Sequence, residues 1–246
     1  MMQIAQKKIF SKRNVVLAVL VLGIVILGYL FLPLFHTKHI IILGNSSIRE
    51  GDISRYTTVD LKKNIYLVKR SRIKEDFMAD PYIKNISIQP KFPRTLVFNI
   101  TERKAVATVK FTGGFAIIDD DATVLETTQD MNRIVKPMIS GIEPKDIVIG
   151  EPMQVESGDL ALGIDIVSNI KSAKLLSNIS LIDISNVKDI RMITPQGIHV
   201  LIGEGEELNE KMLILNKILI NLFERKIYTG YVDMRFDSYP VYRSKK

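Results

Sequence analysis

The chain contains no cysteine and only three histidines among its 246 residues. The lack of cysteine excludes a disulfide-stapled scaffold, a thiolate zinc site, an iron–sulfur site and a cysteine nucleophile. Three histidines are too few for a histidine-rich metal site. The sequence also lacks the G-x-S-x-G motif of serine hydrolases and the P-loop of nucleotide-binding proteins. We therefore expect no catalytic residues, no bound metal and no cofactor.

The composition is that of a globular chain, with 46% hydrophobic and 25% charged residues. The length corresponds to one or two domains of ordinary size. The net charge of +7, from 34 basic and 27 acidic residues, fits a nucleic-acid partner, an anionic surface or neither. No other feature favours nucleic acid, and we expect no such partner.

One long apolar run lies near the start of the chain. Residues 15–32 contain no charge, amide or hydroxyl other than that of Tyr29. As a helix this run spans about 27 Å, and residues 33–35 extend it to about 31 Å, the thickness of the hydrocarbon core of a bilayer. A buried helix of a soluble protein seldom lacks a polar face over five turns. We therefore predict a transmembrane helix over residues 15–35, in contact with the lipid bilayer.

The charges on either side of this run predict its orientation. The first 14 residues carry four cations and no acid, whereas residues 36–44 carry only Lys38 as a fixed charge. Because positive charge stays inside, the N-terminus is expected to be cytoplasmic and the bulk of the chain extracytoplasmic. The alternative is a cleaved signal peptide, but its apolar region is shorter and ends in a small-x-small site that this sequence lacks. We expect an uncleaved, single-pass anchor in the cell membrane.

The residues that follow predict a small unit with the order strand, helix, helix, strand, strand. This order buries its apolar faces in a three-stranded sheet with two helices on one face. The expected elements are the strand 40–43, the helices 46–56 and 71–80, and the strands 86–89 and 95–101. The expected core consists of Ile42, Ile53, Phe77, Ile86, Leu96, Phe98 and Ile100.

A second unit begins at Ala105 without a linker. It alternates short apolar strands with two longer helices, of which the second has leucines and a methionine at three- and four-residue steps. The last residues, Ser238 to Lys246, form a short basic tail that we expect to be disordered. The expected strands are 105–111, 115–119, 123–126, 179–184, 190–194, 198–203 and 230–236, and the expected helices are 159–175 and 208–222.

Short motifs mark the first unit, namely Gly44-Asn45, Asp80-Pro81-Tyr82-Ile83, Phe92-Pro93 and Thr101-Glu102-Arg103-Lys104. In this order, directly after an apolar run, they resemble the POTRA domain of the FtsQ/DivIB family of bacterial cell-division proteins. The asparagine that the family has before the proline is an aspartate in this chain, which keeps the turn chemistry.

The resemblance extends over the second unit. Residues 118–125 follow the family's I-D-x-x-G-x-V-L hairpin, residues 136–141 its P-x-I-x-G segment, and residues 230–236 its closing strand. Ala122 stands where the family usually has glycine. A positive φ would strain an alanine at this site, which favours a turn of another type.

The resemblance implies an α+β protein with a single N-terminal transmembrane helix, a POTRA domain and a mixed α/β domain, called the β domain, with an antiparallel-rich sheet. It implies a non-enzymatic, bitopic scaffold at the division septum, which binds other division proteins outside the membrane and regulates septal peptidoglycan synthesis. The implied direct partners are division proteins of the FtsB/DivIC and FtsL families. The expected boundaries are a cytoplasmic tail at 1–14, the transmembrane helix at 15–35, the POTRA domain at 38–104, the β domain at 105–237 and the tail at 238–246.

Two other functions stay open at this point. A polypeptide-translocation or assembly factor would use the same POTRA fold, but such chains usually carry several POTRA repeats and this sequence has one. A membrane-anchored cell-wall enzyme would need a nucleophile or a metal constellation, and we find neither.

Four groups of residues have the chemistry of a site, but for each the pattern favours a structural role. His36 and His39 have no third ligand in a plausible frame, and His199 reads as a residue on the face of a strand. The triple aspartate 119–121 lacks the ligand spacing of a calcium loop and reads as a solvated turn. The basic cluster 69–74 reads as a solvated helix face, with an anionic polymer, lipid or acidic partner as the alternative.

The segment Thr229 to Tyr239 is the predicted partner-binding surface. It is locally rich in aromatic residues, which are favoured anchors of protein interfaces. A strand that ends a domain often lies at a sheet edge, where unpaired backbone groups accept a partner strand. The resemblance also implies contact with the FtsB/DivIC partner there. Period-two alternation turns Val232 and Met234 inward, and the predicted contact residues are Tyr231, Arg235, Phe236, Ser238 and Tyr239.

Overall fold

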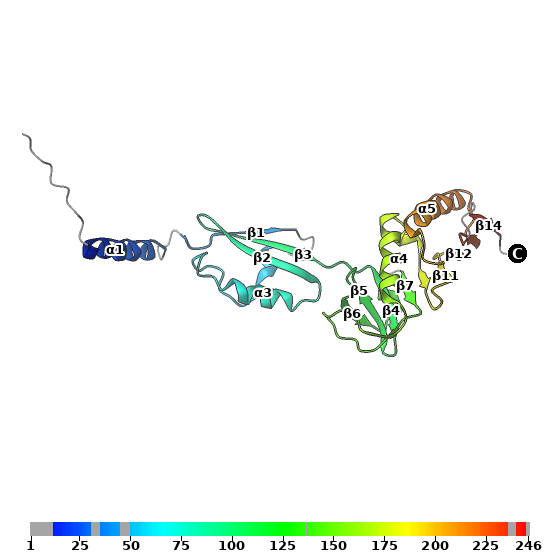
Figure 1. The fold of residues 1–246 in the computed structure, drawn as a ribbon, viewed down its shortest axis with the longest axis horizontal. Helices are drawn as coiled ribbons and strands as arrows, with labels where there is room; N and C mark the ends of the chain where they lie inside the picture. The colour runs from blue at the N-terminus through cyan, green and yellow to red at the C-terminus, as the bar shows by residue number, and fades with distance from the viewer. Residues whose placement is uncertain (1–11, 31–34, 45–49, 136, 236–239, 245–246) are drawn as a thin grey trace, which may run out of the picture. The chain divides into compact units, whose positions relative to one another are not determined.

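The computed structural model describes residues 12–30, 35–44, 50–135, 137–235 and 240–244 (Figure 1). The chain divides into two compact units. Unit 1 contains the residues up to Met78 together with Asn85–Glu102, and unit 2 contains Ala79–Lys84 together with everything from Arg103 onward. The Asp-Pro-Tyr-Ile motif therefore lies in unit 2, although the strand that it begins continues in unit 1.

The first helix, α1 (Lys12–Leu30), covers most of the apolar run. Nine large apolar side chains between Val15 and Val25 are 49–67% exposed, so no part of the protein that the structure describes covers them. Within the described residues, no helix combines the length and apolarity that crossing a membrane requires.

Unit 1 contains a three-stranded sheet with the order β1-β3-β2. β1 (His39–Leu43) pairs in parallel with β3 (Thr95–Glu102), and β2 (Ile83–Lys91) lies on the other side of β3. Between β1 and β2 the chain forms η2 (Glu50–Asp52), α2 (Ile53–Tyr56) and α3 (Arg70–Met78). The predicted element order is confirmed, but the first helix is only four residues long, and its expected capping serines lie outside the described residues.

The core of unit 1 is built around Phe77 of α3. Its ring stacks on Tyr56, with ring centroids 4.7 Å apart, and lies 6.1 Å from the ring of Phe98. Because Ile42 lies on an edge strand, it is only half-buried, which corrects the prediction for that residue. The other predicted core residues are at most 2% exposed, namely Ile53, Phe77, Ile86, Leu96, Phe98 and Ile100.

Unit 2 is organised by a nine-stranded mixed sheet with the order β14-β13-β12-β11-β10-β7-β4-β5-β6. Five of its eight strand pairs are antiparallel and three are parallel. A separate two-stranded sheet joins β8 (Glu143–Pro144) and β9 (Val155–Ser157). The strands of the large sheet are β4 (Ala107–Phe111), β5 (Gly114–Ile118), β6 (Val124–Thr128), β7 (Met138–Ser140), β10 (Leu181–Asp183), β11 (Ile190–Ile193), β12 (Ile198–Gly203), β13 (Gly230–Asp233) and β14 (Val241–Arg243).

Two helices, α4 (Leu160–Ser172) and α5 (Leu208–Glu224), contact each other and share one hydrophobic core with the sheet. The side chain of Asp159 caps α4 by accepting a hydrogen bond from the Leu162 amide at 2.9 Å. The apolar stripe of α5 is buried as its spacing predicts, through Leu208, Met212, Leu215, Leu219 and Leu222. Two short turns, η3 (Met131–Arg133) and η4 (Leu176–Asn178), complete the unit.

Two expectations about turns and tails are wrong. The basic tail is not disordered throughout, because residues 241–243 form β14 and pair with β13. Ala122 has a φ of 60°, so the hairpin keeps the left-handed conformation that the family fills with glycine, and the turn is not of another type.

Candidate partner-binding surface

The predicted closing strand, β13, lies inside the sheet and not at its edge. It pairs in parallel with β12 on one side and antiparallel with β14 on the other. The pairs with β14 join Tyr231 to Arg243, Val232 to Tyr242 and Asp233 to Val241. The argument that β13 offers an unpaired edge is therefore wrong, because the tail of the same chain occupies that edge. The terminal strand of this side of the sheet is β14.

Tyr242 and Gly230 hold β14 in place. The Tyr242 hydroxyl donates a hydrogen bond of 2.8 Å to the backbone carbonyl of Thr229, and the ring packs against the core of unit 2. Gly230 has a φ of 135°, and a Cβ at this position would lie 2.7 Å from the Arg243 carbonyl oxygen and from the Tyr242 ring. Only glycine permits this close approach. The alternation of Val241, Tyr242 and Arg243 was the one sequence signal for the strand, and three residues are too few to separate it from a coil.

The outward face of β13 carries polar and aromatic groups. Tyr231 is 37% exposed, and its ring stacks on His199 of β12 at 5.2 Å between centroids. Beyond the strand, Arg235 donates two hydrogen bonds to the carboxylate of Asp233, from Nε to Oδ1 at 2.9 Å and from a terminal nitrogen to Oδ2 at 2.8 Å. This bidentate pair lowers the pKa of Asp233, although burial opposes the shift.

The structure places only part of the predicted contact set. Tyr231 and Arg235 are both exposed on this surface, whereas Phe236, Ser238 and Tyr239 lie outside the described residues. The predicted inward face is confirmed for Val232 and Met234, which are 0% and 3% exposed. That Tyr231 and Arg235 bind a partner stays a prediction.

The triple aspartate lies in a turn whose Asp120 and Asp121 are exposed, as predicted, but Asp119 is buried and all three carboxylates form ion pairs. Asp119 is fully buried, accepts the backbone N–H groups of Asp121 and Thr123, and is bound by the Arg103 guanidinium at 2.5 Å. Lys84 contacts Asp121 at 2.7 Å, and this hydrogen bond lowers the pKa of the Asp121 carboxyl.

Oxygen atoms of the three aspartates lie within 4.8 Å of one another. Lys171 lies 3.7 Å from Asp120, so three cations stand beside the three carboxylates and balance their charge. We interpret the cluster as a structural brace of unit 2. Neither Lys84 nor Arg103 lies near the aspartates in the sequence, which is why the pattern alone did not indicate the brace.

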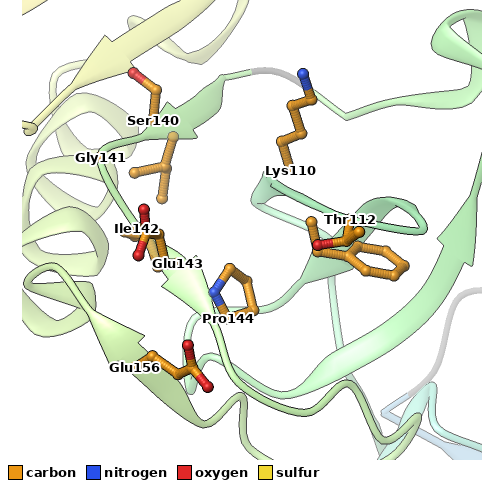
Figure 2. Close-up of a pocket in the computed structure, with 10 residues that line it drawn as sticks. Lys110, Thr112, Ser140, Gly141, Ile142, Glu143, Pro144 and Glu156 are labelled. Carbon is orange, nitrogen blue, oxygen red and sulfur yellow. The ribbon is translucent and has the colours of Figure 1, made fainter.

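A pocket of about 490 Å³ lies between the end of β4 and the small β8–β9 sheet (Figure 2). Lys110 from β4 and Glu143 and Glu156 from β8 and β9 are exposed around it. The Glu143 carboxylate accepts a hydrogen bond from Ser157 at 2.8 Å, and the Ser140 hydroxyl donates to the Ile182 carbonyl. Histidine and cysteine are absent from the residues that line this pocket.

The basic cluster of α3 is exposed and partly paired. Arg72 contacts Asp76 at 3.2 Å and Glu75 at 3.6 Å, which are helical neighbours on the same face. Exposed pairs of this kind contribute little to stability. His199 lies half-buried on the face of β12, as predicted.

Comparison with known proteins gives the family. Residues 35–103 match the family model of the FtsQ-type POTRA domain, and residues 107–235 match the model of the C-terminal region of cell division protein FtsQ/DivIB. A cell division protein DivIB from Clostridium tetani is 28% identical over 85% of this chain and 79% of its own length. Another from Clostridium botulinum (strain Loch Maree) is 26% identical over 99% and 95%.

A more distant relative, cell division protein FtsQ of Koribacter versatilis, is 23% identical over 61% of this chain and 42% of its own length. The two matched regions follow each other without overlap and correspond in order to the strand-helix-helix-strand-strand unit and to the large mixed sheet. The chain belongs to the FtsQ/DivIB family of cell division proteins.

Proposed function

We propose that this protein is a bitopic membrane scaffold of the bacterial division machinery, which binds other division proteins outside the membrane and regulates septal peptidoglycan synthesis. The observation that carries this proposal is the tandem of an FtsQ-type POTRA region and an FtsQ/DivIB C-terminal region over most of the chain. The role is non-enzymatic in this proposal, and division proteins of the FtsB/DivIC and FtsL families are its direct partners.

The cellular experiment replaces a host's own FtsQ/DivIB protein with this chain, fused at its N-terminus to a fluorescent protein. Septal fluorescence and restored division are the expected results. Uniform fluorescence around the cell in filamenting cells would contradict the proposal. Incubation of the purified protein with peptidoglycan should release no fragments, because the role requires binding and no catalysis.

The anchor is part of this proposal. The apolar run 15–32 is long enough for the hydrocarbon core, and the large apolar side chains of α1 from Val15 to Val25 are exposed among the described residues. A large exposed apolar surface on a soluble protein would favour aggregation, whereas in a bilayer it contacts lipid tails. Four cations precede the run, which supports a cytoplasmic N-terminus.

The absence of native cysteine makes the topology straightforward to measure. Two variants, Ser11→Cys and Ser157→Cys, each carry a single cysteine. Each is treated with an impermeant thiol reagent on intact cells whose outer wall has been made accessible, and the labelling of the two variants is compared. Labelling at position 157 and not at position 11 is expected. The reverse pattern would show that the orientation is wrong.

The partner surface is proposed on the β13–β14 end of the sheet, with Tyr231, Arg235, Phe236, Ser238 and Tyr239 as contact residues. Because β14 covers β13, the partner's extended strand would add to β14 or displace it. The stacked ring of Tyr231 and the Arg235 guanidinium are the kinds of group that anchor protein interfaces.

The binding experiment uses the full chain in nanodiscs and the extracytoplasmic segments of FtsB/DivIC-type and FtsL-type partners. Phe236→Lys together with Ser238→Pro should weaken binding by about 2 kcal/mol or more if this segment is a hot spot. Thr127→Lys is the matched control, because Thr127 is exposed on β6 at the opposite end of the same sheet. Unchanged binding by the double variant, with the control also unchanged, would move the partner surface elsewhere.

A further inference from the structure

The residues that follow the proposed anchor, 35–38, contact two loops of unit 1. Phe35 is 4% exposed, and its ring lies edge-on to Tyr66 and Phe92, at 5.8 and 6.1 Å between centroids. The backbone N–H of Thr37 donates to the Lys63 carbonyl at 3.1 Å, and the N–H of Lys38 donates to the Arg94 carbonyl at 2.8 Å. Two segments far apart in the sequence, residues 62–68 and the β2–β3 turn, therefore meet at Phe35. Phe35 was predicted to end the transmembrane helix, and its burial among these loops places it in unit 1 instead.

Both loops expose apolar side chains at this place. Phe92 is 69% exposed, Leu67 is 54% exposed and Tyr66 is 41% exposed. Single exposed apolar residues are ordinary, but here three of them lie on loops that converge on one buried ring. These apolar side chains are exposed at a point where no described part of the protein covers them.

The same loops carry exposed cations. Lys62 and Lys63 precede Tyr66, and Lys91 precedes Phe92. Among the described residues, no carboxylate forms an ion pair with any of these three lysines. The nearby Asp60 instead accepts the backbone N–H of Lys62. We call Lys62, Lys63, Tyr66, Leu67, Lys91 and Phe92 the lysine–aromatic surface.

The covalent chain limits how far this surface lies from the anchor. α1 ends at Leu30, and Phe35 follows five residues later, a distance of at most about 18 Å for an extended chain. Lysines beside exposed aromatic and leucine side chains are the combination that binds the interface of an anionic bilayer, through headgroup charge and shallow apolar insertion. We propose that the lysine–aromatic surface docks unit 1 on the anionic lipid headgroups next to the anchor.

This inference rests on the proposed membrane anchor, and the test separates the two. Cysteines carrying a fluorophore are placed at Leu67→Cys on the surface, Val21→Cys in α1 and Asn85→Cys in β2. Asn85 is exposed and lies six residues from Lys91, which is about 20 Å along the strand. The full chain is reconstituted in nanodiscs that contain spin-labelled lipid and either neutral phosphatidylcholine alone or about a quarter phosphatidylglycerol, which supplies the negative surface potential.

The label at Leu67 should be quenched in the anionic nanodiscs and not in the neutral ones, and added salt should reverse the quenching. The label at Val21 should be quenched in both, and the label at Asn85 in neither. Quenching at Val21 without quenching at Leu67 would overturn the docking surface and leave the anchor intact. Equal quenching at Leu67 in both lipids would overturn the anionic headgroup as the partner. No quenching at Val21 would overturn the anchor, and the docking inference with it.

A charge-reversal variant tests the lysines themselves. Each lysine near an anionic surface strengthens binding about fivefold, so Lys62→Glu, Lys63→Glu and Lys91→Glu together should weaken docking by about a hundredfold or more. The matched control reverses three exposed lysines of unit 2, Lys145→Glu, Lys188→Glu and Lys217→Glu, with the same change in net charge. Equal loss of quenching in both variants would show an effect of net charge and overturn the assignment to this surface.

Discussion

Ala122 occupies a backbone conformation that suits glycine. Its φ is 60°, in the turn that joins the buried Asp119 to β6. The left-handed region brings the Cβ of an L-residue close to the following carbonyl oxygen. The surrounding hydrogen bonds impose this conformation, because the Ala122 amide donates to the Asp119 carbonyl and the Ala122 carbonyl accepts from the Met153 amide.

Ala122→Gly should therefore raise the free energy of unfolding by about 0.5–1 kcal/mol. This is the backbone strain that glycine relieves, minus the cost of the greater conformational entropy that glycine gives to the unfolded chain. Urea denaturation of the full chain in detergent measures this. The control is Ala161→Gly, an exposed position in α4, where the same change should lower stability. Destabilisation by both variants would mean that the alanine is not strained.

The ion pair of Asp233 with Arg235 makes the free energy of unfolding depend on pH. The hydrogen bonds from Arg235 depress its pKa in the folded state below the ordinary value near 3.9. The stabilisation that the pair of Asp233 and Arg235 provides is therefore fully present above the ordinary pKa of the carboxyl. It is lost as the pH falls through the lower pKa that Asp233 has in the folded state. Arg235→Gln should lower stability at pH 7 and leave it less dependent on pH below about 4.

Unfolding in urea at pH 7 and pH 3 is the measurement. Lys145→Gln, which removes an exposed cation that has no ion pair among the described residues, is the control and should leave the pH dependence unchanged. The same loss of stability between the two pH values in wild type and Arg235→Gln would exclude this pair as a source of acid sensitivity.

At the scale of elements, β14 decides which backbone groups the sheet leaves unpaired. It is three residues long, and its contacts with β13 depend on the absence of a side chain at Gly230. A short terminal strand of this kind contributes few hydrogen bonds, so it should open more readily than the strands inside the sheet.

Gly230→Ala should detach β14, because the new Cβ would lie 2.7 Å from the Arg243 carbonyl oxygen. Hydrogen exchange of residues 229–235 and 241–244 should become faster, while α5 keeps its protection. Gly150→Ala is the control, since Gly150 has a φ of +89° but nothing within 4 Å of the added Cβ. Faster exchange at β14 in the control as well would point to general strain and not to loss of the close contact.

At the scale of the whole molecule, the two units have separate cores. Phe98 is fully buried in unit 1 against Phe77. Phe98→Ala should lower the stability of unit 1 by about 3–5 kcal/mol through lost burial and the cavity that remains. Unit 2, whose core does not include Phe98, should keep its stability.

Hydrogen exchange of the full chain in nanodiscs separates the two units, with β3 reporting on unit 1 and β12 on unit 2. Leu43→Ala in β1 is the control, because this side chain is 49% exposed and its loss should cost far less. An equal loss of protection in β3 and β12 would show that the units unfold together.

Most elements could be predicted because their periodicity is local. The alternation of Leu96, Phe98 and Ile100 and the stripe from Leu208 to Leu222 each specify a buried face with little help from the rest of the chain. The motifs from Gly44 to Lys104 resembled those of the family because turns and strand ends also depend on neighbouring residues.

The sequence by itself determined the apolar run, the order of the two units, their buried faces and the family. Tertiary structure alone decided that β14 covers the edge of β13, that Lys84 and Arg103 brace the buried Asp119 and its neighbours, and that Tyr66 and Phe92 meet at Phe35. Each of these joins residues eight or more positions apart, through a backbone pairing, a charge contact or a ring contact. Local periodicity carries no information about such pairs, because the free energy that selects them appears only when the whole chain has packed.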